Sequence, residues 1–193
     1  MPAPWRSPLS RALHRNRSTP NARYFQLATV RPDGSPANRT VVFRSFREGT
    51  DQVQIVCDRR SAKPAQIEHC QRGEICWYFP KTREQFRLTG GLQLITSDEP
   101  SDELQQARTQ AWQAQSDAGR LLFAWPHPAQ PRKPDVAFNE EPPDAAVPLA
   151  NFCLLLLQPQ WVDHLELRGE PQNRWRYTQN ETDGRWSVVE VNP

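Results

Sequence analysis

The stretch RYFQLATVRPDGSPANRTVVFRSF, residues 23–46, decides the fold class of this chain. Residues 23–31 and 38–46 are rich in β-branched and aromatic side chains, and each predicts a strand. Between them, the run PDGSP at 32–36 predicts a turn, because proline fixes φ and glycine readily adopts positive φ. Another strand is expected at 52–58. Three strands in quick succession indicate an antiparallel meander.

Similar patterns continue through the rest of the chain, interrupted by a few helices. Further strands are expected at 74–79, 85–96, 151–158, 162–167, 175–179 and 186–191. Helices are expected at 61–71 and 103–115, and a first helix is predicted from an apolar stripe at Trp5, Leu9, Ala12 and Leu13. The pair Gly90-Gly91 predicts a bulge that bends its strand toward closure. Roughly eight or nine strands predict a mainly β fold, a split antiparallel β-barrel with peripheral helices.

Length and composition indicate one folded domain over residues 1–193, because a chain of 193 residues has little room for two complete cores. The mean hydropathy of −0.79 and the 19 prolines are typical of disorder. Seven tryptophans and eight phenylalanines nevertheless supply the large side chains that a core needs. Prolines crowd the stretch at about 124–148, which predicts a long loop there. Within it, Trp125 is a candidate either to line a ligand pocket or simply to anchor the loop.

Charge and cysteine content argue against several classes of protein. The net charge of +2 gives no overall field for nucleic acid or for a membrane surface, although 21 of the 24 basic residues are arginine. The four cysteines and four histidines do not fall at metal-ligand spacings, so no metal site is predicted. Such cysteines are typical of reduced thiols in a cytoplasmic protein. The longest apolar run, 152–157, is too short to span a bilayer.

The residues before Asp33 leave two alternatives open. They carry six arginines, several serines and no acidic residue, a composition typical of an organellar transit peptide. The same arginines with Trp5 are the basis of a remote alternative, a nucleic-acid-binding module. The apolar stripe in this segment instead favours a structural helix.

The usual enzymatic motifs are missing, and catalytic residues stay unassigned. GxSxG, HExxH, P-loop and GxGxxG patterns do not occur. What remains is a set of cations and hydroxyls, with Arg39 and Arg44 in an expected strand and Ser61 and Lys63 at the start of an expected helix. A helix N-terminus offers free N–H groups and a positive dipole end, and arginine forks on a neighbouring strand can close over the same anion. The set therefore predicts a phosphate site.

A simpler interpretation stays open for the same residues. Ser61 serves as an ordinary N-cap in that case, and Lys63 as a solvated surface cation. In addition, Arg39 and Arg44 are five residues apart, so in a regular strand their side chains point to opposite faces. The two arginines can share a ligand only if the strand bulges or the ligand wraps around its end.

Four segments in register resemble pyridoxamine 5'-phosphate oxidase and its FMN-binding relatives. They are RTVVFR at 39–44, CDRRSAK at 57–63, EQFRLTG at 84–90, and the tail from VDHLEL at 162–167 through PQNRWRY at 171–177. The pattern is most similar to the oxidase-related branch found in photosynthetic organisms, and it covers essentially the whole chain.

The resemblance implies a split-barrel homodimer that binds one FMN at each of two subunit interfaces and acts as an FMN-dependent oxidoreductase on a small molecule. In the family, one set of residues binds the flavin phosphate and lies around it. By position, the residues that match this set are Arg39, Arg44, Ser61 and Lys63. In the family, another segment runs beside the flavin and offers backbone groups to its polar edge. By position, the residues that match this segment are Thr40, Val41 and Val42. Gln85 matches a glutamine near the isoalloxazine, and Arg174 matches a late flavin-contacting arginine.

The chain also departs from the family pattern. Ala62 stands where the oxidases have an arginine, Arg44 replaces a lysine, and Leu165 lies near the place of a tryptophan that covers the flavin. The oxidase substrate motif of arginine, a spacer and histidine has no clear equivalent around Gln172. FMN binding is therefore expected, while oxidation of vitamin B6 phosphates is left open. A non-catalytic flavin or haem carrier of the same fold stays as an alternative.

Overall fold

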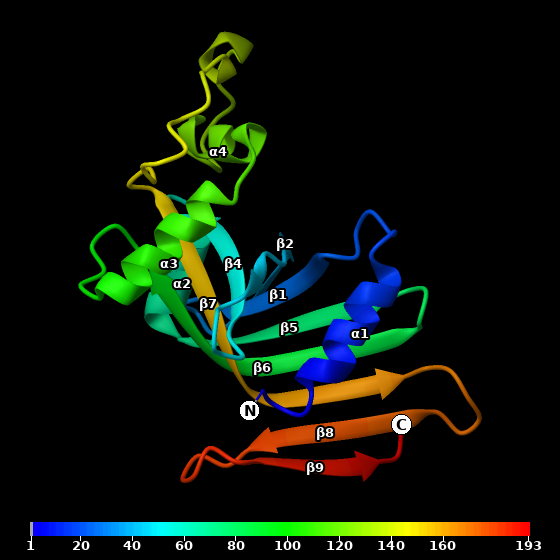
Figure 1. Cartoon of the computed structure of the whole chain (residues 1–193). Coiled ribbons are helices and arrows are strands. Elements are labelled where there is room, and N and C mark those ends of the chain that lie inside the picture. The colour runs from blue at the N-terminus through cyan, green and yellow to red at the C-terminus, as the bar shows by residue number, and fades with distance from the viewer. Residues whose placement is uncertain (1) are drawn as a thin grey trace.

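A computed structural model describes residues 2–193 of the chain, and its central element is a curled antiparallel sheet (Figure 1). Within these residues the sheet has nine strands, in the order β2-β1-β5-β6-β7-β4-β3, with β8 paired to β7 and β9 paired to β8. The strands are β1 (Tyr24–Val30), β2 (Pro36–Val42), β3 (Ser45–Phe46), β4 (Val53–Asp58), β5 (Arg72–Phe79), β6 (Glu84–Ile95), β7 (Phe152–Glu166), β8 (Asn173–Gln179) and β9 (Trp186–Val191). The curled sheet confirms the predicted split-barrel fold.

Helices lie around this sheet. They are α1 (Arg6–Asn16), α2 (Ala62–His69), α3 (Asp102–Gln113) and α4 (Asp117–Ala124), with a 3-10 turn η1 at Asp135–Phe138. The segment from α4 to the start of β7 projects away from the barrel as an arm (Figure 1). No helix among residues 2–193 is long and apolar enough to cross a membrane.

Two clusters of buried side chains form the core. The larger fills the barrel and includes Phe25 and Trp77, and it also contains Trp5, Leu9 and Ala12, so the predicted apolar stripe of the first helix is confirmed. The smaller packs α3 and α4 on the sheet through Trp112, Phe123 and Phe152, whose rings meet edge to face. These clusters hold the ends of β4 and β7, where the candidate site begins.

The predicted bulge at Gly90 is confirmed, because the register between β6 and β7 shifts between Thr89 and Gly90. A Cβ on Gly90 would lie 1.8 Å from the carbonyl oxygen of Gln158, so only glycine fits there. The two strands expected at 151–158 and 162–167 are in fact one strand, β7, which is a correction. Pro159 lies within β7 opposite Gly90, and the irregular pairing at a bulge tolerates a residue that has no N–H.

Two other expectations need correction. The strand expected at 38–46 is divided into β2 and β3, with Arg44 between them. Helix α4 was not expected. Its N-cap is Ser116, whose hydroxyl accepts a hydrogen bond from the Gly119 amide.

Candidate functional site

The turn that joins β4 to α2 contains Ser61 and leads to Lys63. The Arg60 guanidinium forms an ion pair with Asp58, with Nη2 2.6 Å from Oδ2. Both the amide and the hydroxyl of Ser61 donate to the Asp58 carbonyl, at 3.1 and 2.8 Å. Ser61 therefore stands at the N-cap position, but its side chain does not cap the helix. The first turn of α2 keeps its backbone donors free of a side-chain acceptor and contains no acidic residue.

Arg39 reaches the same helix from β2. Its guanidinium donates to Gln66 Oε1 at 2.7 Å, to Thr29 Oγ1 at 2.5 Å and to the Leu27 carbonyl at 3.3 Å. All three acceptors are neutral, and burial lowers the pKa of Arg39. Lys63 lies one helical turn before Gln66, on the same side of α2. Arg39 and Lys63 therefore approach one face of the start of α2.

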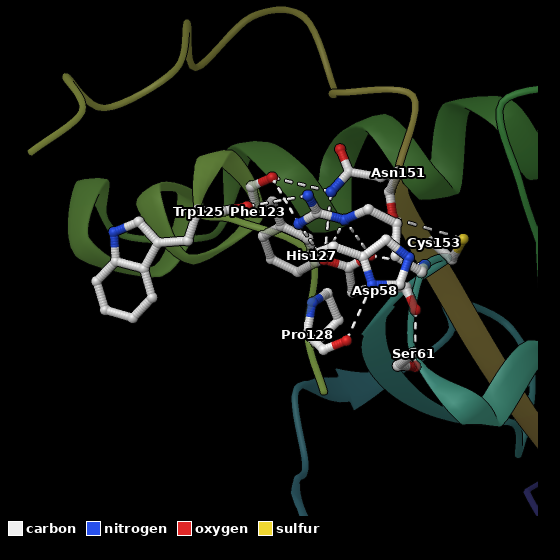
Figure 2. Close-up of polar contacts among 9 residues, drawn as sticks. Asp58, Ser61, Phe123, Trp125, His127, Pro128, Asn151 and Cys153 are labelled. Atoms are coloured by element: carbon white, nitrogen blue, oxygen red, sulfur yellow. Dashed lines mark hydrogen bonds and ion pairs between the residues drawn. The ribbon is translucent and has the colours of Figure 1, made fainter. Parts of the chain in front are cut away.

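Lys63 also lines a cavity of about 450 Å³ between the start of α2 and the arm. Ser61 and Asp58 lie on the barrel side of this cavity, and Trp125 and His127 lie on the arm side. Trp125 thus lines a cavity beside the predicted phosphate residues. Its indole points away from the polar contacts around Asp58 (Figure 2).

Polar contacts around Asp58 fasten the arm to this turn (Figure 2). The Arg60 guanidinium donates to the carbonyls of Trp125 and Phe123, at 2.9 and 3.1 Å. Asn151 Nδ2 donates to the Phe123 carbonyl at 2.9 Å and to Asp58 Oδ2 at 3.3 Å. Burial opposes ionisation of Asp58, but the hydrogen bonds from Arg60 hold its pKa below the ordinary value. Sequence reasoning missed Asn151 and the role of Arg60, because these contacts join segments far apart in the chain.

Arg44 lies apart from the α2 group. It follows the end of β2, where its amide donates to the Gln54 carbonyl at 3.0 Å and its carbonyl accepts from Arg23 Nη2. Its side chain is half-buried between two cavities, one lined by α1 and its following loop and one lined by α3. The Nε atom is buried and has no hydrogen-bond partner among the described residues. Burial and the charge of Arg23 lower the pKa of Arg44.

Gln85 and Arg174 lie on the opposite, open face of the sheet. In the strand register, Gln85 of β6 pairs with Leu165 of β7, and Leu165 pairs with Arg174 of β8, so the three side chains form one row. Thr40 and Val42 of β2 face outward, on the other side of their strand from Arg39 and Val41. The structure thus brings the predicted residues into two main groups, one at α2 and one on the open face.

An ionic network also occupies the open face. Arg174 binds the buried Asp163 through Nε and Nη2, at 2.9 to 3.1 Å, and Arg176 Nε lies 3.5 Å from the same carboxylate. Arg87 pairs with Glu74 at 2.8 Å one strand away. Arg174 therefore already has a carboxylate partner within its own chain.

A second buried group lies beneath the barrel end near α1. His164 Nε2 is 3.0 Å from Glu84 Oε2 and 3.9 Å from Glu166 Oε1, and its ring stacks on Phe86 at 3.9 Å. Ligand atoms of this trio lie within 4.8 Å of one another, a spacing that a metal ion also accepts. Sequence reasoning missed the trio because it depends on the pairing of Glu84 with Glu166 across strands. His164 Nε2 is bonded to Glu84, while its buried Nδ1 has no hydrogen-bond partner among residues 2–193.

The residues at α2 fit the phosphate of a flavin nucleotide. Among residues 2–193, no carboxylate lies within ion-pair distance of Arg39, Arg44 or Lys63. Arg60, which lies in the turn before α2, is instead paired with Asp58. A half-buried guanidinium with neutral acceptors, a lysine, and an uncapped helix N-terminus form the donor set that a phosphate dianion needs.

Several known proteins are similar to this chain. Residues 2–96 match the family model described as pyridoxamine 5'-phosphate oxidase, FMN-binding domain. Pyridoxine/pyridoxamine 5'-phosphate oxidase 2 of Arabidopsis thaliana is 37% identical over 193 residues, covering 99% of this chain and 98% of the relative. The crystal structure of a pyridoxamine 5'-phosphate oxidase-related, FMN-binding protein from Nostoc punctiforme superposes with a TM-score of 0.97, at 57% identity and with both chains fully covered. PhzG from Burkholderia lata shares the fold, with a TM-score of 0.79 at 18% identity, over 100% of this chain and 94% of that one.

Proposed function

Because the chain belongs to the pyridoxamine 5'-phosphate oxidase-related family of FMN-binding proteins, we propose that it is an FMN-dependent oxidoreductase acting on a small molecule. The observation that carries the proposal is the cationic group at α2, which has no carboxylate partner among residues 2–193. Such a group binds phosphate more readily than it binds a neutral ligand.

We assign the flavin phosphate to Arg39, Lys63 and the start of α2. The Arg39 guanidinium supplies a planar fork, and Lys63 supplies a compact ammonium. The Ser61 hydroxyl donates to the Asp58 carbonyl, so Ser61 shapes the turn and its hydroxyl proton is already used there. The Asp58–Arg60 pair fixes the same turn to the arm, which lets Trp125 and its neighbours line the cavity above it.

We assign the isoalloxazine side of the site to the outward-facing residues. Gln85 offers an amide, and the backbone of Thr40, Val41 and Val42 offers donors and acceptors to a polar ring edge. Arg174, held in place by Asp163 through Nε and Nη2, keeps its Nη1 group as a donor toward the ring. When bound, the flavin supplies the hydride-transfer chemistry, and these residues bind and orient it and exclude water. Arg44, with its unpartnered Nε, is placed to attract the acidic part of a substrate or of the cofactor.

We propose that two copies of the chain share each flavin. Arg39 on β2 and Arg174 on β8 are separated by five strand spacings, about 24 Å measured along the sheet. One flavin nucleotide fits both assignments most simply if one copy supplies the α2 group and the second copy supplies its open face. That face exposes Tyr24 and Tyr78, at 49% and 45%, which is apolar area available for a homodimer contact.

We place the protein in the cytoplasm, because its four cysteines are free thiols. The substrates to test first are pyridoxamine and pyridoxine 5'-phosphates, since they belong to the named activity of the Arabidopsis relative.

The visible absorbance spectrum of the purified protein, followed by fluorescence-quenching titrations with FMN and riboflavin, tests the binding half of the proposal. We expect FMN to bind much more tightly than riboflavin. Oxygen consumption with the two B6 phosphates, measured on the FMN-loaded protein, tests the oxidase half. A protein that takes up no flavin contradicts the proposal outright.

A second candidate, a non-catalytic flavin carrier, is favoured by one observation. The connection between β7 and β8 contains no histidine near Gln172, where the oxidase substrate motif is expected. Bound FMN that no pyridine nucleotide, B6 vitamer or oxygen pulse can reduce or reoxidise supports the carrier. Turnover with any of these donors eliminates it.

A further inference from the structure

Two of the four cysteines face each other beside the proposed phosphate site. Cys57, on β4, pairs directly with Cys153, on β7, and the Cys153 thiol donates to the Asn151 carbonyl, with the sulfur 3.9 Å from the oxygen. Two residues further along the ladder, the Arg59 amide donates to the Asn151 carbonyl at 2.8 Å. Because hydrogen-bonded pairs alternate along antiparallel strands, the cysteine pair is also of this kind, with Cα atoms about 5.5 Å apart. Disulfides typically span Cα separations of about 4.4–6.8 Å.

The surroundings of the two thiols distinguish them. Both are buried, with Cys57 4% exposed and Cys153 fully enclosed. The neighbouring Cys57 thiol and the charges of Arg108 and Arg59 lower the pKa of Cys153, and burial opposes them. The neighbouring Cys153 thiol and burial raise the pKa of Cys57. Cys153 is therefore the better nucleophile and Cys57 the resolving thiol.

The pair is joined to the phosphate site through short covalent and hydrogen-bonded links. Cys57 precedes Asp58, whose carbonyl holds Ser61. Cys153 lies two residues after Asn151, whose amide holds Asp58 from the other side (Figure 2). The Cβ atoms of a cross-strand pair lie about 4.5–5.5 Å apart, whereas a disulfide requires about 3.8 Å. Closing this gap moves the end of β4 relative to the start of β7, and with it the turn that leads to Lys63.

We propose that Cys57 and Cys153 form a reversible disulfide, with a hydroperoxide as oxidant, that weakens FMN binding at the α2 site. The Cys153 thiolate attacks a peroxide oxygen, the O–O bond breaks, and a sulfenic acid forms as hydroxide leaves and takes up a proton. The Cys57 sulfur then attacks the Cys153 sulfur, the S–O bond breaks, and water leaves with the Cys57 proton. The two thiols lose two electrons in total, and hydrogen peroxide is reduced to two waters. Hydrogen peroxide has only two heavy atoms, so it is small enough to serve as the oxidant of a buried pair.

The first test is chemical and does not depend on the proposed function. The full-length protein is reduced, freed of reductant, treated with hydrogen peroxide, and digested without reduction for mass spectrometry. We expect a Cys57–Cys153 cross-linked peptide, a loss of two titratable thiols, and reversal by dithiothreitol. The Cys70→Ser variant is the matched control and should form the same cross-link. Peroxide that leaves the pair as thiols, or that oxidises one cysteine without a cross-link, overturns the proposal.

The second test measures the coupling to FMN, which rests on the proposed phosphate site. We expect the oxidised protein to bind FMN about tenfold more weakly than the reduced protein. This change in affinity corresponds to the loss of roughly one charge-assisted hydrogen bond. Peroxide should not change FMN affinity in Cys57→Ser. A cross-link that forms without any change in FMN affinity overturns the coupling. The effect of Lys63→Ala on the reduced protein reports separately on whether the phosphate assignment itself is correct.

Discussion

Replacing Lys63 by alanine tests the phosphate assignment with little disturbance of the fold. The ammonium of Lys63 forms no ion pair among residues 2–193, and alanine is a good helix former. The change therefore removes a positive charge from the start of α2 and leaves the packing of that helix intact. Loss of flavin affinity in this variant is then attributable to the missing charge.

The expected size of the effect follows from burial and charge. A hydrogen bond between charged groups contributes roughly 1.5–3 kcal/mol, and Lys63 is half-buried, so the lower half of this range applies. FMN binding should weaken about 13- to 45-fold, while riboflavin, which lacks the phosphate, should change less than about twofold. For Arg39→Ala, whose guanidinium has only neutral partners, a larger loss of about 30- to 150-fold is expected.

Fluorescence quenching with FMN and riboflavin in parallel, on wild type and variant, measures both affinities. Arg59→Ala is the matched control, since Arg59 lies in the same turn but pairs at the surface with Asp98. Its FMN affinity should match wild type. Equal losses for FMN and riboflavin in Lys63→Ala, or no loss for either, would refute the assignment of the phosphate to α2.

Three further predictions concern stability, each measured by urea unfolding. Gly90→Ala should cost more than about 3 kcal/mol because its Cβ meets the Gln158 carbonyl, whereas Gly91→Ala, which has open space, should cost less than about 1 kcal/mol; similar values for the two would contradict the bulge geometry. Arg174→Ala should cost about 2–4 kcal/mol because it leaves the Asp163 carboxylate, 1% exposed, with only Arg176 at 3.5 Å, and unchanged stability would rule out a structural ion pair. Burial opposes ionisation of Glu84, but hydrogen bonds with His164 and Thr82 lower its pKa. The ionised carboxylate therefore adds to the free energy of unfolding above pH 4.5, the ordinary pKa, and this contribution is lost as pH falls through the lowered pKa. Glu84→Gln should therefore flatten the decline in stability below about pH 4.5, and an equally steep decline in the variant would show that other groups cause it.

Features encoded locally in the sequence were the ones that could be predicted. The stripe from Trp5 to Ala12 carries the period of a helix, and the glycine pair at 90–91 marks a bulge whatever its partner strand. Arg39 and Lys63 were predicted as parts of one anion site because a helix start and a neighbouring strand end are local features. The structure brings both to the same helix.

Features that depend on pairing between distant segments could not be predicted. Pro159 interrupts a strand pattern, and only its position opposite Gly90 explains why β7 continues through it. The Arg60 guanidinium donates to the Trp125 carbonyl of the arm, a contact across more than 60 residues. The group of Glu84 and His164 likewise depends on the register between β6 and β7.

Mixing two single variants tests most directly the claim that two copies share each flavin. Lys63→Ala removes a residue of the α2 group and Gln85→Ala removes one of the open face, so a mixed dimer keeps one site in which both halves are intact. Refolding the two variants together in equal amounts and titrating with FMN should restore wild-type affinity in about a quarter of the sites. If a single chain provides the whole site, the mixture should show no tight sites, and that result would contradict the account.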